Sequence, residues 1–356
     1  MYIHMNSDEI IEILSTIKHP ETDTDIATSG ILHEVRIDAD KINVSLIFKS
    51  NDAFVASIKE AVAKEISLHY PSMEIKVSAI RKENPPVKKK EIPEIGLAKV
   101  KHIIAVASGK GGVGKSTVST NLAVALARAG YKTGLVDADL YGPSIPKMFG
   151  IEGAQPAMVN CDGYELIEPV ERFDVRILSI GFFVSADDPV IWRGPMAVGA
   201  LRQLTKQGNW GEIDYLIVDL PPGTGDIHIT LVQELQFSAA VIVTTPQEVA
   251  LADAIKGVNM FLNPKINVPI AGLVENMAWF TPAELPDNKY YIFGKDGGRQ
   301  MAEQLNIQLL GQIPLIQSIR EGGDSGSPIA VGESSAANIF DSIAQKVIDF
   351  VEKKNT

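Results

Sequence analysis

The sequence predicts an α/β protein with a mostly parallel, doubly wound sheet, preceded by a small α+β domain. Two observations carry this prediction. From Val100 onward, short apolar runs alternate with helical stretches, an order typical of parallel sheets covered on both faces. Before that point, a block has the order helix, strand, strand, helix, strand, and a stretch rich in proline and lysine follows it. We therefore expect a small domain at residues 1–81, a linker at 82–99 and a large domain at 100–356.

The small domain is predicted from the spacing of its hydrophobic residues. Apolar residues recur at helical intervals in Asp8–Ile17 and Phe54–His69. Strand patterns occupy three further segments, which are His33–Ile37, Lys41–Phe48 and Glu74–Ile80. The acidic turn at residues 38–40 joins the first two strands. These segments give the order αββαβ.

The linker is recognised by its composition. Arg81–Lys99 contains Pro85, Pro86 and Pro93, with the run Lys88–Lys90 between them. Prolines remove backbone donors and lysines resist burial, so we expect a solvated connection. A local basic binding patch is the alternative interpretation of the lysine run.

The large domain contains several apolar runs of buried-strand type, with helical stretches between most of them. The predicted strands are His102–Ala107, Thr133–Asp137, Val175–Ile180, Asp214–Asp219, Ala239–Thr244 and Val268–Val274. The predicted helices include Ser116–Ala129, Ala250–Leu262 and Gly298–Leu305. A hairpin turn is expected at Asp162–Gly163.

Composition restricts the class of protein. The 356 residues carry a net charge of −11, which disfavours a general binder of nucleic acid or anionic membranes, because both surfaces repel an acidic protein. The sequence has no uninterrupted run of about 18 apolar residues, so we expect no membrane span. Residues 1–8 do not resemble a signal peptide. The single cysteine, Cys161, cannot form an internal disulfide. We expect a cytoplasmic protein.

One segment predicts a phosphate-binding loop. Residues 109–117 satisfy the pattern G-x-x-x-x-G-K-[ST], with a buried strand directly before them and a helix directly after. Glycines let the backbone N–H groups point at phosphate oxygens, and the helix N-terminus adds positive charge. Lys115 would bridge the β- and γ-phosphates, and Ser116 would supply a hydroxyl to Mg²⁺. The sequence therefore predicts a P-loop NTPase fold that binds ATP through Gly109, Lys110, Gly111, Gly112, Val113, Gly114, Lys115, Ser116 and Thr117.

Three aspartates follow predicted strands of the same sheet. Asp137 and Asp139 end the second strand, and Asp219 follows the apolar run Tyr215–Val218. Carboxyl ends of parallel strands meet at one edge, where α/β proteins bind ligands. We expect Asp137 and Asp219 to join Ser116 around Mg²⁺, with strand capping as the alternative for each aspartate alone. The stiff turn Pro221–Gly225 would let its backbone sense the γ-phosphate.

Several segments together resemble the Mrp/ApbC family of iron–sulfur cluster carrier ATPases, within the deviant Walker A class that includes MinD and ParA. They are Gly109–Thr117, Val136–Ile145, Trp192–Pro195, Tyr215–Asp226, Val274–Met277 and Gln317–Gly323. The likeness covers nearly all of residues 100–350. The N-terminal block resembles the small domain of iron–sulfur assembly proteins.

The resemblance implies a homodimer that hydrolyses ATP slowly and passes an iron–sulfur cluster, of [4Fe–4S] type, from the assembly machinery to apo-proteins. It implies that Lys110 reaches the partner's nucleotide and acts with Lys115 in catalysis, while Asp139 orients the attacking water. It also implies that Asn276 contacts the adenine edge, with Pro314 nearby. From the residues alone, Lys110 could be a solvated loop charge and Asn276 a turn residue.

The chain departs from the family pattern at the cluster ligands. The family carries Cys-x-x-Cys shortly after the Glu-Asn-Met segment, whereas Ala278–Pro286 contains no cysteine. Clusters are normally held by four thiolates, and a symmetric dimer of this chain has only two, both Cys161. The cluster ligands are therefore unknown, with Cys161 a candidate whose alternative role is a small, partly buried residue. His228 is expected either to touch the nucleotide site or to lie on or cap the following helix.

Alternative functions share the same loop. A positioning switch like MinD or ParA would need a basic amphipathic tail or basic face, but Ile339–Val351 carries mixed charges and is expected to pack on the core. An assembly ATPase that binds no cluster itself is a second alternative. A metabolic kinase would need an acceptor pocket, of which the sequence gives no sign.

Overall fold

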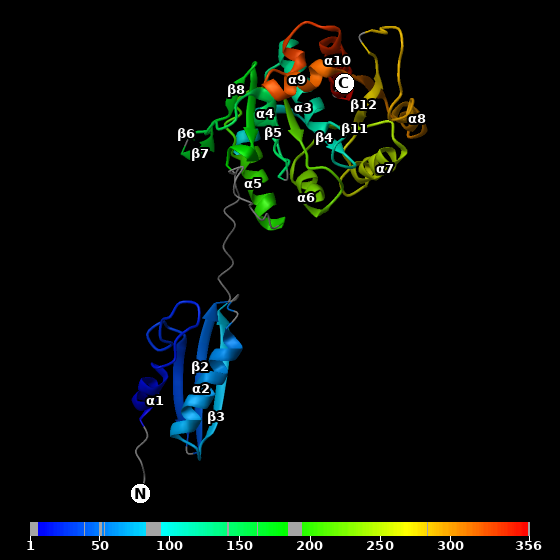
Figure 1. Ribbon diagram of the computed structural model, residues 1–356. Helices are drawn as coiled ribbons and strands as arrows, with labels where there is room; N and C mark the ends of the chain where they lie inside the picture. Colours follow the sequence, from blue (N-terminus) through cyan, green and yellow to red (C-terminus); the bar gives the residue numbers. More distant parts are fainter. Residues whose placement is uncertain are drawn as a thin grey trace. The chain divides into compact units, whose positions relative to one another are not determined.

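The computed structural model describes residues 6–38, 40–49, 52, 54–82, 94–140, 142–161, 163–183, 194–282 and 284–354 (Figure 1). The chain divides into two compact units, residues 1–91 and 92–356. Within the described ranges, no helix has the length and apolar character needed to cross a membrane.

The first unit is a three-stranded sheet with two helices. Its elements are α1 (Ser7–Leu14), β1 (Leu32–Asp38), β2 (Lys41–Lys49), α2 (Val55–His69) and β3 (Glu74–Lys82). The strands have the order β1-β2-β3, with β1 antiparallel and β3 parallel to β2. Apolar residues of both helices and alternate residues of β2 form one buried cluster, which includes Ile58 and Val62 from α2 and Val44 and Leu46 from β2. The expected element order αββαβ is confirmed.

The second unit is built on an eight-stranded sheet of order β13-β12-β11-β4-β10-β5-β9-β8, in which only β8 and β9 pair antiparallel. The strands are β4 (Val100–Ser108), β5 (Thr133–Asp137), β8 (Val170–Arg172), β9 (Val175–Ser179), β10 (Ile213–Asp219), β11 (Ala239–Thr244), β12 (Ile270–Phe280) and β13 (Leu309–Leu315). The central strands are nearly continuous buried apolar runs, because helices cover both of their faces.

Helices cover the two faces of this sheet and bury two separate hydrophobic clusters (Figure 1). One face holds α5 (Gly194–Lys206), α6 (Asp226–Glu234), α7 (Glu248–Leu262) and α8 (Gly297–Gln304). The other face holds α3 (Lys115–Arg128), α4 (Ile145–Phe149) and α10 (Ser335–Lys354), with α9 (Gln317–Ser325) beside α4. The predicted doubly wound α/β fold is confirmed.

The structure also settles several local predictions. The stripe on α10 is buried, including Phe340, Ile343 and Val347, so its packing on the core is confirmed. A hairpin joins β6 (Met158–Cys161) to β7 (Tyr164–Ile167), as expected from the turn signal, although Asp162 itself lies outside the described residues.

Other predictions differ from the structure or fall outside it. Strand β12 runs six residues beyond the predicted end at Val274. Strand β13 was not predicted, because Gly311, Gln312 and Pro314 interrupt its apolar pattern. The proline and lysine positions proposed for the linker, at 85–93, and Trp192 lie outside the described residues.

Candidate functional site

The predicted phosphate loop connects the end of β4 to the start of α3. Gly112 and Gly114 have φ angles of +82° and +85°, in the left-handed region that favours glycine. Gly114 directly precedes α3, and no side chain of the described residues caps this helix start. The first N–H groups of α3 are therefore available for an anion. Phosphate binding at a helix N-terminus depends on such open N–H groups.

Two glycines fix this loop against its neighbours. A Cβ atom at Gly109 would lie 2.5 Å from the Ala254 nitrogen and closer still to the Asp253 carbonyl in α7. A Cβ atom at Gly114 would overlap the side-chain nitrogen of Asn276 in β12. The loop backbone thus passes close to the backbone of α7 at Gly109 and to the Asn276 side chain of β12 at Gly114.

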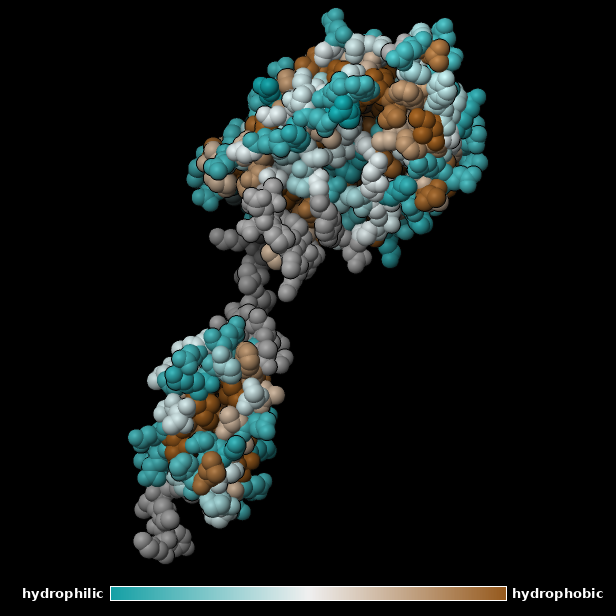
Figure 2. Space-filling view, in the orientation of Figure 1, coloured by the Kyte–Doolittle hydropathy of each residue, from teal (hydrophilic) through white to brown (hydrophobic). Residues whose placement is uncertain are grey.

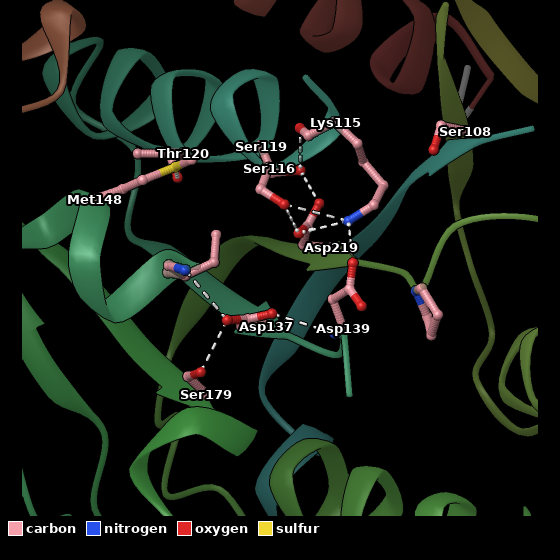
Figure 3. A network of polar contacts seen from close by, with 12 residues as sticks. Ser108, Lys115, Ser116, Ser119, Thr120, Asp137, Asp139, Met148, Ser179 and Asp219 are labelled. Atoms are coloured by element: carbon pink, nitrogen blue, oxygen red, sulfur yellow. Dashed lines mark hydrogen bonds and ion pairs between the residues drawn. The ribbon is translucent and has the colours of Figure 1, made fainter. Parts of the chain in front are cut away.

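Lys115 lies in a buried cluster of polar groups at the carboxyl edge of the sheet (Figure 3). Its Nζ donates to Asp219 Oδ2 at 2.7 Å and lies 3.6 Å from Asp139 Oδ2. Ser116 Oγ also donates to Asp219 Oδ2, at 2.7 Å. The structure therefore brings together four residues from three motifs, Lys115 and Ser116 from the phosphate loop and Asp139 and Asp219 from the ends of two strands.

The charge state of Lys115 follows from this cluster. Burial alone lowers the pKa of its ammonium group, but the negative charges of Asp219 and Asp139 outweigh that effect and raise the pKa above its ordinary value. Lys115 consequently stays positively charged although it is only 5 % exposed.

Asp137 and Asp219 are register partners on the neighbouring strands β5 and β10, and both are fully buried. Asp137 accepts hydrogen bonds from the Asp139 and Ile145 backbone N–H groups, at 3.2 and 3.3 Å, and from Ser179 Oγ at 2.9 Å. Burial and the nearby charge of Asp219 raise the pKa of Asp137 to about 7. Two adjacent buried carboxyls of this kind favour a bound cation.

A cavity of 430 Å³ opens beside the phosphate loop. Its lining includes Gly114, Thr117, Asn276 and Pro314, with apolar side chains such as Ile319 completing the wall. Asn276 is 7 % exposed and donates from Nδ2 to the Val113 carbonyl at 2.9 Å, which fixes its amide. Both residues expected near the adenine therefore lie in one apolar cavity that adjoins the loop, and a turn role for Asn276 is wrong because it lies inside β12.

Lys110 and Cys161 are not part of this cluster. Lys110 is half-buried, and its carbonyl accepts a hydrogen bond from Ser108 Oγ at 2.9 Å. Cys161 is a free, half-buried cysteine at the end of β6. Its hairpin leads into β8 at one edge of the large sheet, whereas residues 278–286 begin in the last three residues of β12, near the other edge. Within the described part of the chain, no group of three or more His, Cys, Asp or Glu side chains could hold a metal ion.

The segment 278–293, where the sequence offers no cysteine, is rich in aromatic residues. Phe280 and Tyr290 pair through two backbone hydrogen bonds of 2.9 and 2.8 Å, and Lys289 Nζ lies 4.0 Å from the centre of the Trp279 ring. Phe280, Tyr290 and Ile292 are exposed. Figure 2 shows hydrophobic surface on the large unit where Figure 1 draws the connection from β12 to α8.

Sequence reasoning missed two serines that support the aspartates. Ser119 Oγ donates to Asp219 Oδ1 at 2.5 Å and is fully buried. It lies four residues after Lys115, on the same face of α3, so helical spacing could have revealed it. Ser179, which donates to Asp137, ends β9. That β9 lies beside β5 in the sheet is seen in the structure and does not follow from the sequence pattern of either strand.

Comparisons with known proteins agree with this geometry. The family model described as NUBPL iron-transfer P-loop NTPase matches residues 99–348, and a second, described as iron–sulfur cluster assembly protein, matches residues 7–77. An "Iron-sulfur cluster carrier protein" of Synechocystis is 42 % identical over 350 residues, covering 96 % of this chain and 97 % of the relative. A protein of the same description from Aquifex aeolicus is 48 % identical over 276 residues, which are 76 % of this chain and 72 % of the relative.

Solved structures show the same fold. A nucleotide-binding protein from Archaeoglobus fulgidus, in complex with ADP, is 37 % identical, with a TM-score of 0.57, over 65 % of this chain and 89 % of that chain. The cell division ATPase MinD of Pyrococcus furiosus has a TM-score of 0.52 at 24 % identity, over 70 % of this chain and 98 % of that chain, and this likeness concerns the fold alone. The resemblance drawn from the motifs is thus confirmed, and the chain belongs to the NUBPL iron-transfer P-loop NTPase family.

Proposed function

We propose that this protein binds and slowly hydrolyses ATP and delivers iron–sulfur clusters to apo-proteins. The observation that carries the ATPase part is the buried contact of Lys115 and Ser116 with Asp219 at the end of the phosphate loop. The names of the relatives, iron–sulfur cluster carrier proteins, support the delivery part.

Nucleotide binding would use a charge that is already in place. The ammonium of Lys115 is paired with carboxylates, and burial among them keeps it protonated. An arriving triphosphate offers a higher density of negative charge than these carboxylates, together with the open N–H groups of residues 109–117. We infer that Lys115 then turns to the β- and γ-phosphates, with the adenine in the cavity lined by Asn276 and Pro314.

Magnesium fits the oxygen atoms at this edge of the sheet. Ser116 Oγ and Asp219 Oδ2 lie 2.7 Å apart, with Asp137 on the adjacent strand. Hydroxyl and carboxylate oxygens are the ligands that Mg²⁺ prefers. Bound there, the ion would neutralise charge on the β- and γ-phosphates. We therefore assign Ser116, Asp137 and Asp219 to its coordination, directly or through water.

Hydrolysis needs an oriented water more than a strong base. Asp139 lies next to Lys115, at the side of the site opposite Ser116, and we assign it to the attacking water. In a homodimer, Lys110 of the second copy would add a positive charge next to the phosphates of the nucleotide bound by the first. A site that depends on a partner for one cation would turn over slowly as a monomer.

The cluster itself is cargo, and Cys161 is the candidate ligand that the sequence offers. The segment 278–286 offers no thiolate, and Cys161 lies toward the other edge of the sheet. This observation favours a second candidate function, an ATPase that assists iron–sulfur assembly without holding the cluster. Either function would place the protein in the cytoplasm, with the assembly machinery and apo-proteins as partners. A membrane-binding switch has less support, because the apolar stripe of α10 is buried.

Two experiments test these assignments. We expect Lys115→Ala to abolish ATP hydrolysis in a nucleotide-only assay, and normal turnover by this variant would contradict the assigned site. Anaerobic reconstitution with iron and sulfide, followed by absorption and EPR spectra, tests the cargo. A cluster signal that is lost in Cys161→Ala would support direct ligation by this chain. No signal in the wild type would leave the accessory ATPase as the function.

A further inference from the structure

His228 is a buried histidine beside the turn that follows Asp219. It is the third residue of α6 and is 2 % exposed, so a place on the helix surface is wrong. Its Nδ1 lies 3.0 Å from the carbonyl oxygen of Pro221, and its ring packs edge-on against Phe261 of α7, with ring centres 5.9 Å apart. The side chain therefore reaches back from α6 to the start of the turn.

The hydrogen bond fixes the tautomer of His228. A carbonyl oxygen can only accept, so Nδ1 must carry the proton. Burial lowers the pKa of this histidine to about 4, and the ring is neutral. Its Nε2 has no hydrogen-bond partner among the described residues. Burying an unpaired acceptor costs stability, so apolar packing does not account for a histidine at this position. What the ring adds is its bond to Pro221.

The turn 221–225 has few backbone N–H groups of its own that could anchor it, so a donor from outside the turn can help to hold it. Pro221 and Pro222 have no backbone N–H, and the neighbouring residues of the turn are bonded elsewhere. Leu220 N donates to the Val106 carbonyl at 3.0 Å, and Gly223 N donates to the Ser108 carbonyl at 2.9 Å. These two bonds tie the turn to β4, directly before the phosphate loop. His228 supplies the tie on the other side, to α6.

We propose that His228 is a positioning residue for ATP hydrolysis, which holds the turn 221–225 in register with the phosphate loop through its hydrogen bond to Pro221. Because the prolines restrict the turn and Gly223 is bonded to β4, a fixed Pro221 carbonyl determines where the backbone of residues 223–225 meets the γ-phosphate. This inference rests on the proposed ATPase function, and it adds a residue that contacts neither nucleotide nor metal.

Three substitutions of His228 separate the hydrogen bond from packing. His228→Asn keeps an N–H donor at the atom equivalent to Nδ1. His228→Gln moves the donor one bond further along the side chain, and His228→Leu removes it. Phe261→Leu is the packing control, because it removes the ring contact and leaves the hydrogen bond to Pro221 in place.

The first measurement is hydrogen–deuterium exchange of residues 220–229 in the nucleotide-free full chain. Loss of one hydrogen bond predicts exchange about tenfold faster in His228→Leu and His228→Gln, and exchange within about threefold of wild type in His228→Asn. Equal exchange in the asparagine and leucine variants would overturn the inference. So would an equal acceleration in Phe261→Leu, since packing alone would then explain the effect.

The second measurement is single-turnover ATP hydrolysis alongside the nucleotide dissociation constant. We expect His228→Leu to lower the rate about tenfold with the dissociation constant within about threefold, and His228→Asn to restore the rate. A leucine variant with the wild-type rate would overturn the catalytic part. A wild type that binds ATP without hydrolysing it would refute the proposed ATPase, and the exchange data would still decide whether His228 holds the turn.

Discussion

Lys115 Nζ lies 2.7 Å from Asp219 Oδ2, and both side chains are almost completely withdrawn from solvent. Without nucleotide, this ion pair is the main compensation for the buried carboxyls of Asp219 and Asp137. Removing one partner of a buried pair is strongly destabilising, because an uncompensated charge stays behind. The same contact therefore contributes to folding before it contributes to chemistry.

We predict that Lys115→Met lowers the free energy of unfolding of the nucleotide-free protein by about 3 kcal/mol. Methionine fills a similar volume, so the loss reports the charge. Urea denaturation monitored by circular dichroism measures it. Lys101→Met is the matched control, since Lys101 is paired with Asp214 at the same 2.7 Å but is 69 % exposed in its side chain. Solvent screens an exposed pair, so its loss should cost much less than the loss of the buried one. Equal losses in the two variants would contradict the role assigned to burial.

A second prediction concerns Ser119, which donates to the other oxygen of Asp219. We expect Ser119→Ala to lower magnesium-dependent ATP hydrolysis about tenfold, because a hydrogen bond to a charged group contributes roughly 1.5–3 kcal/mol. Steady-state phosphate release at saturating ATP measures the effect. Thr120→Ala is the control from the next position of α3, where the hydroxyl points to Met148 Sδ at 3.5 Å. A Thr120→Ala loss as large as that of Ser119→Ala would indicate a general disturbance of the helix.

Much of the site could be predicted from sequence because its residues follow simple rules. The strand–loop–helix order predicted a phosphate-binding loop at residues 109–117. Because the carboxyl ends of parallel strands share one edge of the sheet, Asp137, Asp139 and Asp219 were expected to lie close together there. Ser179 could not be predicted in the same way. Its contact with Asp137 depends on β9 being the neighbour of β5, which is a property of strand order and not of local pattern.

The missed part of the fold has a similar physical origin. Edge strand β13 carries Pro314, which a central strand would not tolerate, and Gly311 and Gln312 interrupt its apolar run, so periodicity alone does not reveal it. Strand β12 continues past Asn276 through Met277, whose φ is +56°, an uncommon value for a residue other than glycine. The pairing of β12 with β13 shifts register between Asn276 and Phe280, on either side of this residue, and the sequence of β12 alone does not reveal its partner strand.

The close approach of Gly109 to α7 gives a third prediction. A Cβ atom there would overlap the backbone at Asp253, which cannot move aside as a flexible side chain would. We expect Gly109→Ala to lower the free energy of unfolding of the nucleotide-free protein by about 2 kcal/mol or more. Thermal unfolding measures it. Gly111→Ala is the control within the same loop, because a Cβ atom at Gly111 would meet nothing within 4 Å. A Gly111→Ala loss equal to that of Gly109→Ala would show that the contact with α7 is not the cause.

The depressed pKa of His228 gives a fourth prediction, on stability as a function of pH. In the folded protein burial holds the pKa at about 4, whereas an unfolded histidine has a pKa near its ordinary value of 6.5. Between these values the unfolded chain binds a proton that the folded chain does not, so stability falls as pH falls from about 7 to 4. The contribution of this one group is about 3 kcal/mol.

His228→Asn isolates that contribution, because asparagine keeps a donor for Pro221 and has no titration in this range. As the pH is lowered from 7 to 4, we expect the free energy of unfolding to fall more steeply in the wild type than in the variant, since only the wild type loses the histidine contribution. Urea denaturation at four or five pH values measures both curves. Carboxyl groups titrate in both proteins and cancel in the difference. A difference that stays constant over this pH range would show that His228 is not held neutral by burial.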